Sequence, residues 1–369
     1  REVGFEDRAS KVKEHGRAMF RVIVAGNANA GKTTIFNALT GSRAQVGNYP
    51  GVTVSRSSRV IQLPDQTEVE VVDLPGTYSL SSYSPDEQVA VDEVLGRQQT
   101  LPAAVVVVVD ACALERGLYL ALQVIETGVP VVVALNMIDE ADAGGFVIDT
   151  DKLATWLGVE VVPMVASAGT GLEGLRKAIA SAVRQAPQDA VTQPRFSKAA
   201  EQAVAEIEQS FDETNYINTP AVRRSWATWS LLSYDADDDG TKDLPVSARQ
   251  AIEAARERAR GAEINLDQDV IAARYYWIEH VVGDVRQTVR EVGRSLTDRI
   301  DNILTDRIYG TLAFAVVMWV LFEALFSWSD PFIGMIEDAT SALQDMVTTV
   351  LPVGPIQDLL VNGVIAGVG

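Results

Sequence analysis

A glycine-rich stretch near the start of the chain has the residue types and spacing of a phosphate-binding loop. Gly26 and Gly31 bracket four small residues, and Lys32 and Thr33 follow directly, which gives G-x-x-x-x-G-K-T. Such glycines let the backbone wrap around a phosphate chain, which the loop N–H groups and the next helix N-terminus then face. The lysine reaches the β- and γ-phosphates, and the Thr33 hydroxyl ligates Mg²⁺. The predicted nucleotide contacts are Gly26, Asn27, Ala28, Asn29, Ala30, Gly31, Lys32, Thr33 and Thr34.

Two later motifs supply groups for the phosphate end of the same site. Thr53 lies in the stretch NYPGVTVS, and its hydroxyl is expected to complete the Mg²⁺ shell when a γ-phosphate is present. Asp73 follows a strand-like run, and its carboxylate is expected to hold Mg²⁺ through water, while the Gly76 N–H donates to the γ-phosphate. The predicted contacts from these motifs are Gly51, Val52, Thr53, Asp73, Leu74, Pro75 and Gly76.

A second pair of motifs points to guanine as the base. In N-M-I-D, the Asp139 carboxylate can accept hydrogen bonds from both N1–H and the 2-amino group of guanine, which adenine does not offer. A backbone N–H of Ser167-Ala168 is expected to bind the guanine O6. Each motif is weak alone, but their order, each just after a strand, favours GTP over ATP. The predicted base contacts are Asn136, Met137, Ile138, Asp139, Ser167 and Ala168.

Asn29 is the candidate for assisting hydrolysis. Many GTPases orient the attacking water with a glutamine after the D-x-x-G glycine, but Thr77 occupies that place here and is too short. Neither Arg56 nor Arg59 has an identified role as an arginine finger. A K⁺ ion held by the Asn29 amide oxygen would add positive charge at the phosphates. The alternative is that Asn29 only ties the loop together by hydrogen bonds. The catalytic candidates are Lys32, Asn29, Thr53 and Gly76, and the metal candidates are Thr33, Thr53 and Asp73 for Mg²⁺ and Asn29 for K⁺.

The elements around these motifs predict an α/β P-loop domain with a doubly wound, mainly parallel sheet. Strand-like runs alternate with helical patterns, as βαβ units require. Ligands of such sheets bind at the C-terminal ends of the strands, where the motifs fall. The stretch 41–58 is rich in Gly, Ser, Asn and Pro and predicts a long loop. The strand-like runs are 20–25, 59–63, 68–73, 103–110, 131–135 and 159–165.

Composition limits the class of protein. The net charge of −19, from 31 basic and 50 acidic residues, opposes nucleic acid as a main partner. The single cysteine, Cys112, excludes a disulfide framework and is expected to pack as a small apolar residue. No secretory signal opens the chain, and Arg1 together with the apolar last residues predicts a fragment.

The rest of the chain predicts a leader, a linker, a helical domain and a membrane segment. We expect a leader at 1–19, the GTPase domain at 20–184, a linker at 185–195 and an all-helical domain at 196–304. Ile271, Tyr275, Ile278 and Val282 form one apolar stripe in that domain. The acidic run 235–239 is expected to be a solvated loop, because it lacks the later glutamate of a calcium loop.

Residues 309–328 are long and apolar enough to span a bilayer. The run has one ionisable residue, Glu323, and aromatic residues near both ends. Arg299 and Arg307 favour a cytoplasmic position for its N-terminal side. A buried helix of a soluble protein is the alternative, and Glu323 is either functional or simply snorkels from the helix end. Residues 331–350 predict an amphipathic or re-entrant helix.

The motifs GNANAGKT, NYPGVTVS, DLPGTYSL, NMID and SAGTG, followed by ARYYWI and LTDRIDNILTDRIYG, together resemble the ferrous iron transport protein B family of bacteria. The resemblance implies a GTPase domain, a helical domain that influences nucleotide release, and a permease for Fe²⁺ that would begin at 305–369. It also implies that Asn29 matches a K⁺-binding asparagine. Ala28 departs from the family's usual proline.

The same resemblance sets expectations for partners and location. It implies GTP, Mg²⁺ and K⁺ as cofactors, Fe²⁺ as the transported substrate, and the bacterial inner membrane, with the GTPase and helical domains in the cytoplasm. Membrane lipid is an expected partner, and a homo-oligomer and small accessory transport proteins remain open. The rival interpretations are a soluble regulatory GTPase of the ribosome-assembly or tRNA-modification type, and a nucleotide-sensing module without hydrolysis.

Overall fold

The computed structural model places the chain in two compact units, residues Arg1–Glu291 and Val292–Gly369. The described residues are 20–41, 45–48, 55–80, 85–96, 101–186, 194–211, 219–234, 244–288, 300, 304–328 and 330–368. The predicted leader and the acidic run 235–239 lie outside them.

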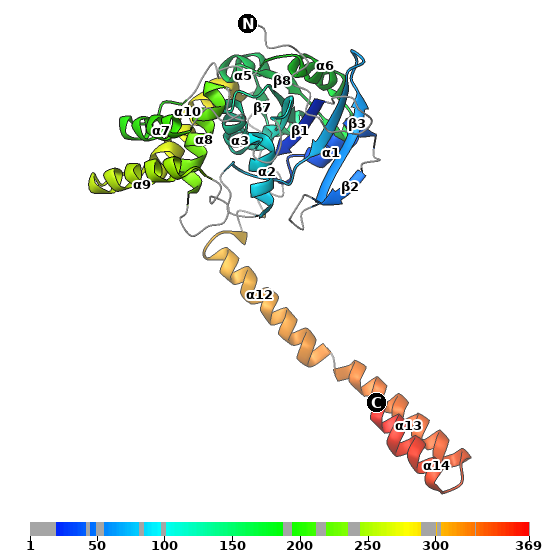
Figure 1. Ribbon diagram of the computed structural model, residues 1–369. Helices are drawn as coiled ribbons and strands as arrows, with labels where there is room; N and C mark the ends of the chain where they lie inside the picture. The colour runs from blue at the N-terminus through cyan, green and yellow to red at the C-terminus, as the bar shows by residue number, and fades with distance from the viewer. Residues whose placement is uncertain are drawn as a thin grey trace. The chain divides into compact units, whose positions relative to one another are not determined.

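A seven-stranded sheet forms the centre of the first unit (Figure 1). Its order is β2-β3-β4-β1-β5-β6-β8, with every neighbouring pair from β4 to β8 parallel, so the predicted mainly parallel sheet is confirmed. The strands are β1 (Phe20–Gly26), β2 (Gln45–Asn48), β3 (Ser55–Gln62), β4 (Glu68–Asp73), β5 (Ala104–Asp110), β6 (Val131–Asn136) and β8 (Glu160–Pro163).

Helices cover both faces of the sheet, as the alternating pattern predicts. One face packs against α1 (Lys32–Thr40) and α6 (Leu172–Val183), and the other against α2 (Pro85–Leu95), α3 (Leu114–Glu126) and α5 (Thr150–Leu157). Strand β5 shows why its sequence is apolar without alternation. Val105 and Val107 enter one core layer and Val106 and Val108 the other, so the strand is buried on both sides.

The prediction of one long loop at 41–58 is wrong in part. Residues Gln45–Asn48 form β2, which pairs antiparallel with the start of β3, Asn48 opposite Ser55. Glycine, serine and asparagine have low strand propensity, but pairing along the edge of the sheet satisfies their backbone groups regardless of side chain. Residues 49–54, which include Gly51, Val52 and Thr53, lie outside the described part of the chain.

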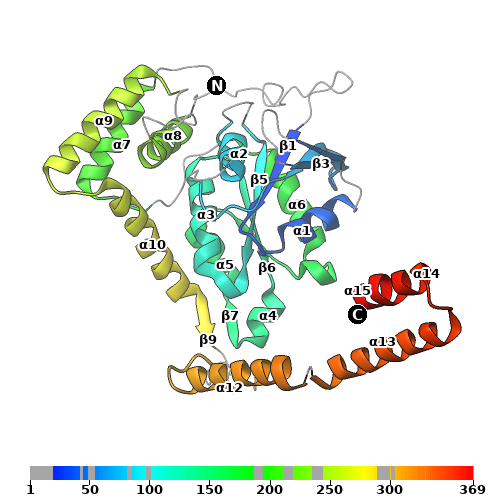
Figure 2. The ribbon, with the colours of Figure 1, turned by 90° about the horizontal axis from the view of Figure 1, so that it is seen from below.

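In its described residues, the predicted helical segment contains α7 (Lys198–Ser210), α8 (Pro220–Ser233), α9 (Val246–Gly261) and α10 (Leu266–Val285). Side-chain oxygens of Ser197, Thr219 and Asn265 cap three of these helices. Helices α8 and α10 pack against α3, so the helical segment shares one apolar core with the sheet (Figure 2).

The predicted apolar stripe of α10 is half wrong. Ile278 and Val282 are buried, but Ile271 and Tyr275 are 37% and 45% exposed. The buried face runs instead through Val270, Arg274 and Ile278. A hydrophobicity pattern misses this face because it contains an arginine, and Arg274 is buried only because an acidic residue of α3 pairs with it.

Two short strands in this unit were not predicted. β7 (Phe146–Ile148) pairs antiparallel with β9 (Arg286–Thr288), which directly follows α10. The segment 196–304 is therefore not purely helical, because its end returns to pair with the nucleotide-binding domain.

The second unit has helices with exposed apolar surfaces. α12 (Tyr309–Glu323) continues into a π-helix (Ala324–Trp328), and α13 (Asp330–Val350), α14 (Pro355–Asp358), a π-helix (Leu359–Ile365) and α15 (Ala366–Val368) follow. Tyr309–Phe326 is the one stretch of the described helices that is long and apolar enough to cross a membrane, and none of it is buried.

Candidate nucleotide-binding site

The glycine-rich loop joins the end of β1 to the start of α1 and has a left-handed backbone at two positions. Asn29 has a φ of 66°, which asparagine tolerates better than most residues, and Gly31 has a φ of 86°. A Cβ on Gly31 would lie 2.2 Å from the side-chain Nδ2 of Asn136. Only glycine therefore fits at this position, and the Ala30 carbonyl lies within hydrogen-bonding reach of Asn136.

Lys32 and Asp73 face each other at the phosphate end. The Lys32 Nζ donates to the Asp73 Oδ1 over 3.1 Å, and both side chains are largely buried. Burial raises the pKa of the Asp73 carboxyl above its ordinary value, although the charge of Lys32 acts in the opposite direction. The structure thus brings together Lys32, at the start of the helix after β1, and Asp73, at the end of the neighbouring strand β4.

The D-L-P-G turn lies directly against the glycine-rich loop. A Cβ on Gly76 would lie 3.2 Å from the Ala28 Cα, and the Thr77 N–H donates to the Gly26 carbonyl over 3.2 Å. The Thr77 hydroxyl is buried and donates to the Ser79 carbonyl over 2.6 Å. Thr77 therefore has a structural contact in place of the glutamine found there in many GTPases. Leu74 and Pro75 complete this turn.

Asn136 joins the loops of the base end. Its side chain is buried, donates to the Ala30 carbonyl over 3.0 Å and accepts from the Ala166 N–H over 2.9 Å. It thereby connects the glycine-rich loop, the end of β6 and the short helix η3 (Ala166–Ala168). Leaving such buried groups unpaired would cost about 1–3 kcal/mol each, so these three segments are held together.

The predicted base-reading groups lie on the segments that Asn136 connects. Asp139 is exposed in the first turn of α4 (Ile138–Ala143). Met137, the residue just before this helix, has a left-handed backbone with a φ of 61°. Ser167 and Ala168 are exposed in η3. The Asp139 carboxylate and the exposed turn of η3 are the groups that a base could meet here, and within η3 the Ala168 N–H already donates to the Val165 carbonyl over 3.1 Å.

Several residues of this region are suited to binding a nucleotide together with Mg²⁺. Thr33 and Thr34 are exposed in the first turn of α1, next to Lys32, so the Thr33 hydroxyl is accessible to a metal. Asn27 is buried, and its Nδ2 donates to the Arg116 carbonyl over 3.1 Å. Its amide oxygen has no hydrogen-bond partner among the described residues. The Asn29 side chain is exposed on the same loop, as a cation ligand requires.

Both arginines considered from the sequence, Arg56 and Arg59, lie in strand β3. The Arg56 Nη2 donates to the Glu70 Oε1 over 2.8 Å. Among the described residues, no group of three or more His, Cys, Asp or Glu side chains is arranged to hold a metal ion.

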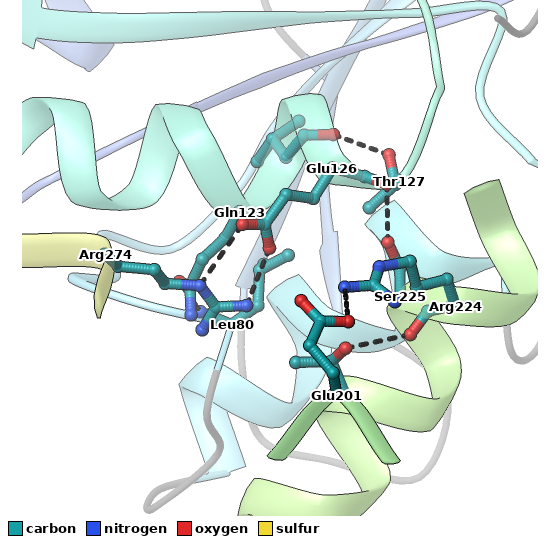
Figure 3. Close-up of polar contacts among 10 residues, drawn as sticks. Leu80, Gln123, Glu126, Thr127, Glu201, Arg224, Ser225 and Arg274 are labelled. Carbon is teal, nitrogen blue, oxygen red and sulfur yellow. Dashed lines mark hydrogen bonds and ion pairs between the residues drawn. The ribbon is translucent and has the colours of Figure 1, made fainter. Parts of the chain in front are cut away.

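A polar contact path behind the phosphate end was not predicted (Figure 3). The Leu80 N–H, four residues after Gly76, donates to the Gln123 Oε1 of α3 over 2.8 Å. On the next turn of α3, Glu126 pairs with the buried Arg274 of α10, with a shortest distance of 2.6 Å, and the Ser225 hydroxyl donates to the Glu126 carbonyl over 2.7 Å. Burial alone would lower the pKa of Arg274, but Glu126 raises it above its ordinary value.

This path connects the D-x-x-G turn to the helical segment through one helix. An amphipathic pattern gave no signal for Gln123 and Glu126, because a polar residue on a helix is normally assigned to solvent. The arginine at 274 on an otherwise apolar face of α10 was the one available clue.

The comparisons with known proteins agree with this geometry. A family model described as ferrous iron transport protein B matches residues 20–179. The Fe(2+) transport protein A/Fe(2+) transporter FeoB fusion protein of Porphyromonas gingivalis is 35% identical over 370 residues, which cover 97% of this chain and 43% of that protein.

Two solved structures are also similar. A GDP-bound variant of the S. thermophilus FeoB G-domain is 35% identical with a TM-score of 0.61, over 73% of this chain and 100% of that one. The cytosolic domain of the T. maritima FeoB iron transporter in its GMPPNP form is 31% identical with a TM-score of 0.59, over 73% of this chain and 100% of that one.

The sheet, the glycine-rich loop and the Asn136 junction define an α/β P-loop protein of the GTPase fold. The chain belongs to the ferrous iron transport protein B family, which confirms the resemblance found in its motifs. It spans less than half the length of the curated relatives, 43% for the P. gingivalis protein.

Proposed function

We propose that this chain binds GTP, hydrolyses it to GDP and phosphate, and forms the nucleotide-controlled part of a bacterial Fe²⁺ transporter. One observation carries the nucleotide part of the proposal. The 3.0 Å hydrogen bond from Asn136 to Ala30 joins the predicted base-reading segment to the predicted phosphate-binding loop. Relatives solved with GDP and with GMPPNP support the same ligand class.

In this proposal, each end of the site has a separate task. Lys32 and the loop N–H groups, including that of Gly76, bind the β- and γ-phosphates, and Asp139 with η3 selects guanine. Thr33, Thr53 and Asp73 would hold Mg²⁺, which when bound neutralises part of the phosphate charge. Asn29 would hold K⁺ on the exposed side of the loop.

The transport part of the proposal rests on family membership and on the second unit. Curated relatives are described as Fe(2+) transporters, and one is fused to an Fe(2+) transport protein A, which makes a small accessory protein a candidate partner. The exposed apolar helix Tyr309–Phe326 supports a position in the inner membrane, with the first unit in the cytoplasm. We assign 20–184 to the GTPase domain, 185–195 to the linker, 196–304 to the helical domain and 305–369 to the start of the permease.

A phosphate-release assay on the full chain tests the enzymatic part. With Mg²⁺ and K⁺ present, GTP should be bound and should yield phosphate, while ATP at the same concentration should yield none above background. Binding of GTP without phosphate release would contradict the enzymatic part of the proposal and favour a nucleotide-sensing module. Failure to bind guanine nucleotides would reject the proposal.

Alkaline carbonate extraction tests the membrane part. The full chain should stay in the membrane pellet, and Val317→Lys should reduce that fraction, because a lysine near the centre of a span costs about 2.5–3.5 kcal/mol. Recovery of the unmodified chain in the supernatant would favour the soluble regulatory GTPase.

A further inference from the structure

The helix that carries Asp139 is too short to be stable by itself. α4 (Ile138–Ala143) has six residues, well below the length at which isolated helices persist in water. Its start is held by Asn136 and by the Ile138 N–H, which donates to the Met164 carbonyl over 3.4 Å. Its end passes through the Gly144–Gly145 turn directly into β7. The position of Asp139 therefore depends on what holds β7.

The partner of β7 comes from the far end of the first unit. β9 pairs antiparallel with it, with Val147 opposite Gln287 and Ile148 opposite Arg286, and the Asp149 N–H donates to the Val285 carbonyl over 2.9 Å. Figure 2 shows β9 leaving α10 and lying beside β7. A ribbon of two strands with three residue pairs is marginal in water without added side-chain contacts.

Arg286 supplies such contacts to two segments that adjoin α4, namely β7 and the start of α3. Its guanidinium lies 3.8 Å from the centre of the Phe146 ring, which is a close cation–π contact. Its Nη1 also donates to the Glu115 Oε1 over 3.4 Å. Glu115 lies in the first turn of α3, just after the short helix η2 (Ala111–Ala113), and η2 packs against α4. Arg286 thus connects β7, the strand after α4, with the start of α3, which directly follows the η2 segment that packs against α4.

We propose that Arg286 is a positioning residue for guanine recognition: by clamping β9 onto β7, it fixes α4 and the Asp139 carboxylate against the base. This inference rests on the proposed function, because it needs a guanine nucleotide to be the ligand. Arg286 acts through Phe146 and Glu115 and touches no nucleotide itself. Linkage makes the effect reciprocal, so a bound guanine nucleotide stabilises the β7–β9 ribbon.

The test compares binding of GDP with binding of IDP. IDP lacks the 2-amino group from which the Asp139 carboxylate is expected to accept a hydrogen bond. In the full chain, Arg286→Ala should reduce the preference for GDP over IDP by roughly fivefold to thirtyfold, the factor that corresponds to losing a contact of about 1–2 kcal/mol. The rate at saturating GTP should stay at the parent value, because the phosphate groups are untouched. Arg286→Lys should keep more of the preference than Arg286→Met, because a cation over the Phe146 ring is retained.

Asp284→Ala is the matched control. Asp284 lies two residues before Arg286 and binds Lys152 and Trp156 of α5, so its loss should leave the preference for GDP unchanged. If Arg286→Ala acted only by lowering overall stability, both variants would have a changed melting temperature, and neither would have a changed preference for GDP over IDP. Hydrogen exchange should show that GDP slows the exchange of the β7 and β9 amides in the parent.

A disulfide across the ribbon separates positioning from a folding defect. Val147→Cys with Gln287→Cys, in a Cys112→Ser background, places two cysteines at directly opposite residues of the antiparallel pair. Oxidation should restore the preference for GDP in Arg286→Ala, and reduction should remove it again. If Arg286→Ala keeps the parental preference, or if the oxidised lock does not restore it, the inference is wrong. If the parent binds no guanine nucleotide, the proposed function itself fails.

Discussion

The predicted phosphate end and the predicted base end of the site occupy the same edge of the sheet, but their polar groups are held in different ways. At the phosphate end, two opposite charges face each other, Lys32 and Asp73, at 3.1 Å. At the base end, the buried amide of Asn136 binds two backbone groups, and Asp139 remains exposed. One end relies on charge and the other on fixed backbone geometry.

Because of this difference, a ligand must replace existing side-chain contacts at one end of the site, whereas at the other end the backbone is already in place. A phosphate group and Mg²⁺ would each replace one partner of the Lys32–Asp73 pair, so binding exchanges one set of charged contacts for another. A base would meet a site whose backbone is already held by Asn136 and by the β7–β9 ribbon. We therefore expect substitutions at the phosphate end to change affinity and rate, and substitutions at the base end to change selectivity.

The largest expected effect is at the phosphate end. Lys32→Met should weaken GTP binding by roughly 30-fold to 5,000-fold, the range for removing one member of a buried charged pair, about 2–5 kcal/mol. Equilibrium binding with a fluorescent GTP analogue measures it. Lys177→Met removes an exposed lysine that pairs with Glu173 and should leave the affinity at the parental value. Parental affinity in Lys32→Met would remove Lys32 from the phosphate site.

A smaller but more selective effect is expected at the base end. Asp139→Asn should weaken GTP more than tenfold and improve xanthosine triphosphate, because mismatched buried hydrogen-bonding groups cost about 1–3 kcal/mol. Competition binding with both nucleotides measures the switch. Asp142→Asn, on the same helix, is also exposed and should not change the base preference. Unchanged binding of GTP by Asp139→Asn would contradict the guanine assignment.

Asn29 tests whether the phosphate end uses a second cation. Hydrolysis should be slow in Na⁺ and several-fold faster in K⁺, and Asn29→Ala should lose this stimulation while retaining most nucleotide binding. Phosphate release in matched KCl and NaCl buffers measures it, with Asn37→Ala as the control on α1. Equal rates of the parent in both salts, lowered alike by Asn29→Ala, would leave Asn29 with only the hydrogen-bonding role.

The smallest effect concerns the stability of the free protein. Burial raises the pKa of Asp73, so its contribution to stability is complete below its ordinary pKa of 3.8 and is lost as the pH rises through the folded-state pKa. The melting temperature of Asp73→Asn relative to the parent should therefore increase from acid toward neutral pH. A change of about 1 kcal/mol corresponds to roughly 2–4 °C in a domain of this size. If the melting temperature of Asp73→Asn relative to the parent decreased as the pH rises, the charge of Lys32 would outweigh burial in setting the pKa of Asp73.

The sequence by itself determined the parts of the molecule whose signals are local. The glycine-rich loop needs glycine at 31 and a strand and helix beside it, and all of this lies within one short segment. The valines of β5 predict a strand covered on both faces because each residue is apolar regardless of its neighbours in space.

Only the tertiary structure decided the contacts between segments far apart in the chain. Arg274 is buried because Glu126 lies opposite, and neither residue signals the other along the sequence. Three-residue strands such as β7 and β9 have no periodicity to read, and β2 has poor strand propensity; each forms because a partner strand satisfies its backbone. The path from Leu80 to α10 and the clamp by Arg286 are therefore products of the fold, because pairing energy depends on proximity that only the folded chain provides.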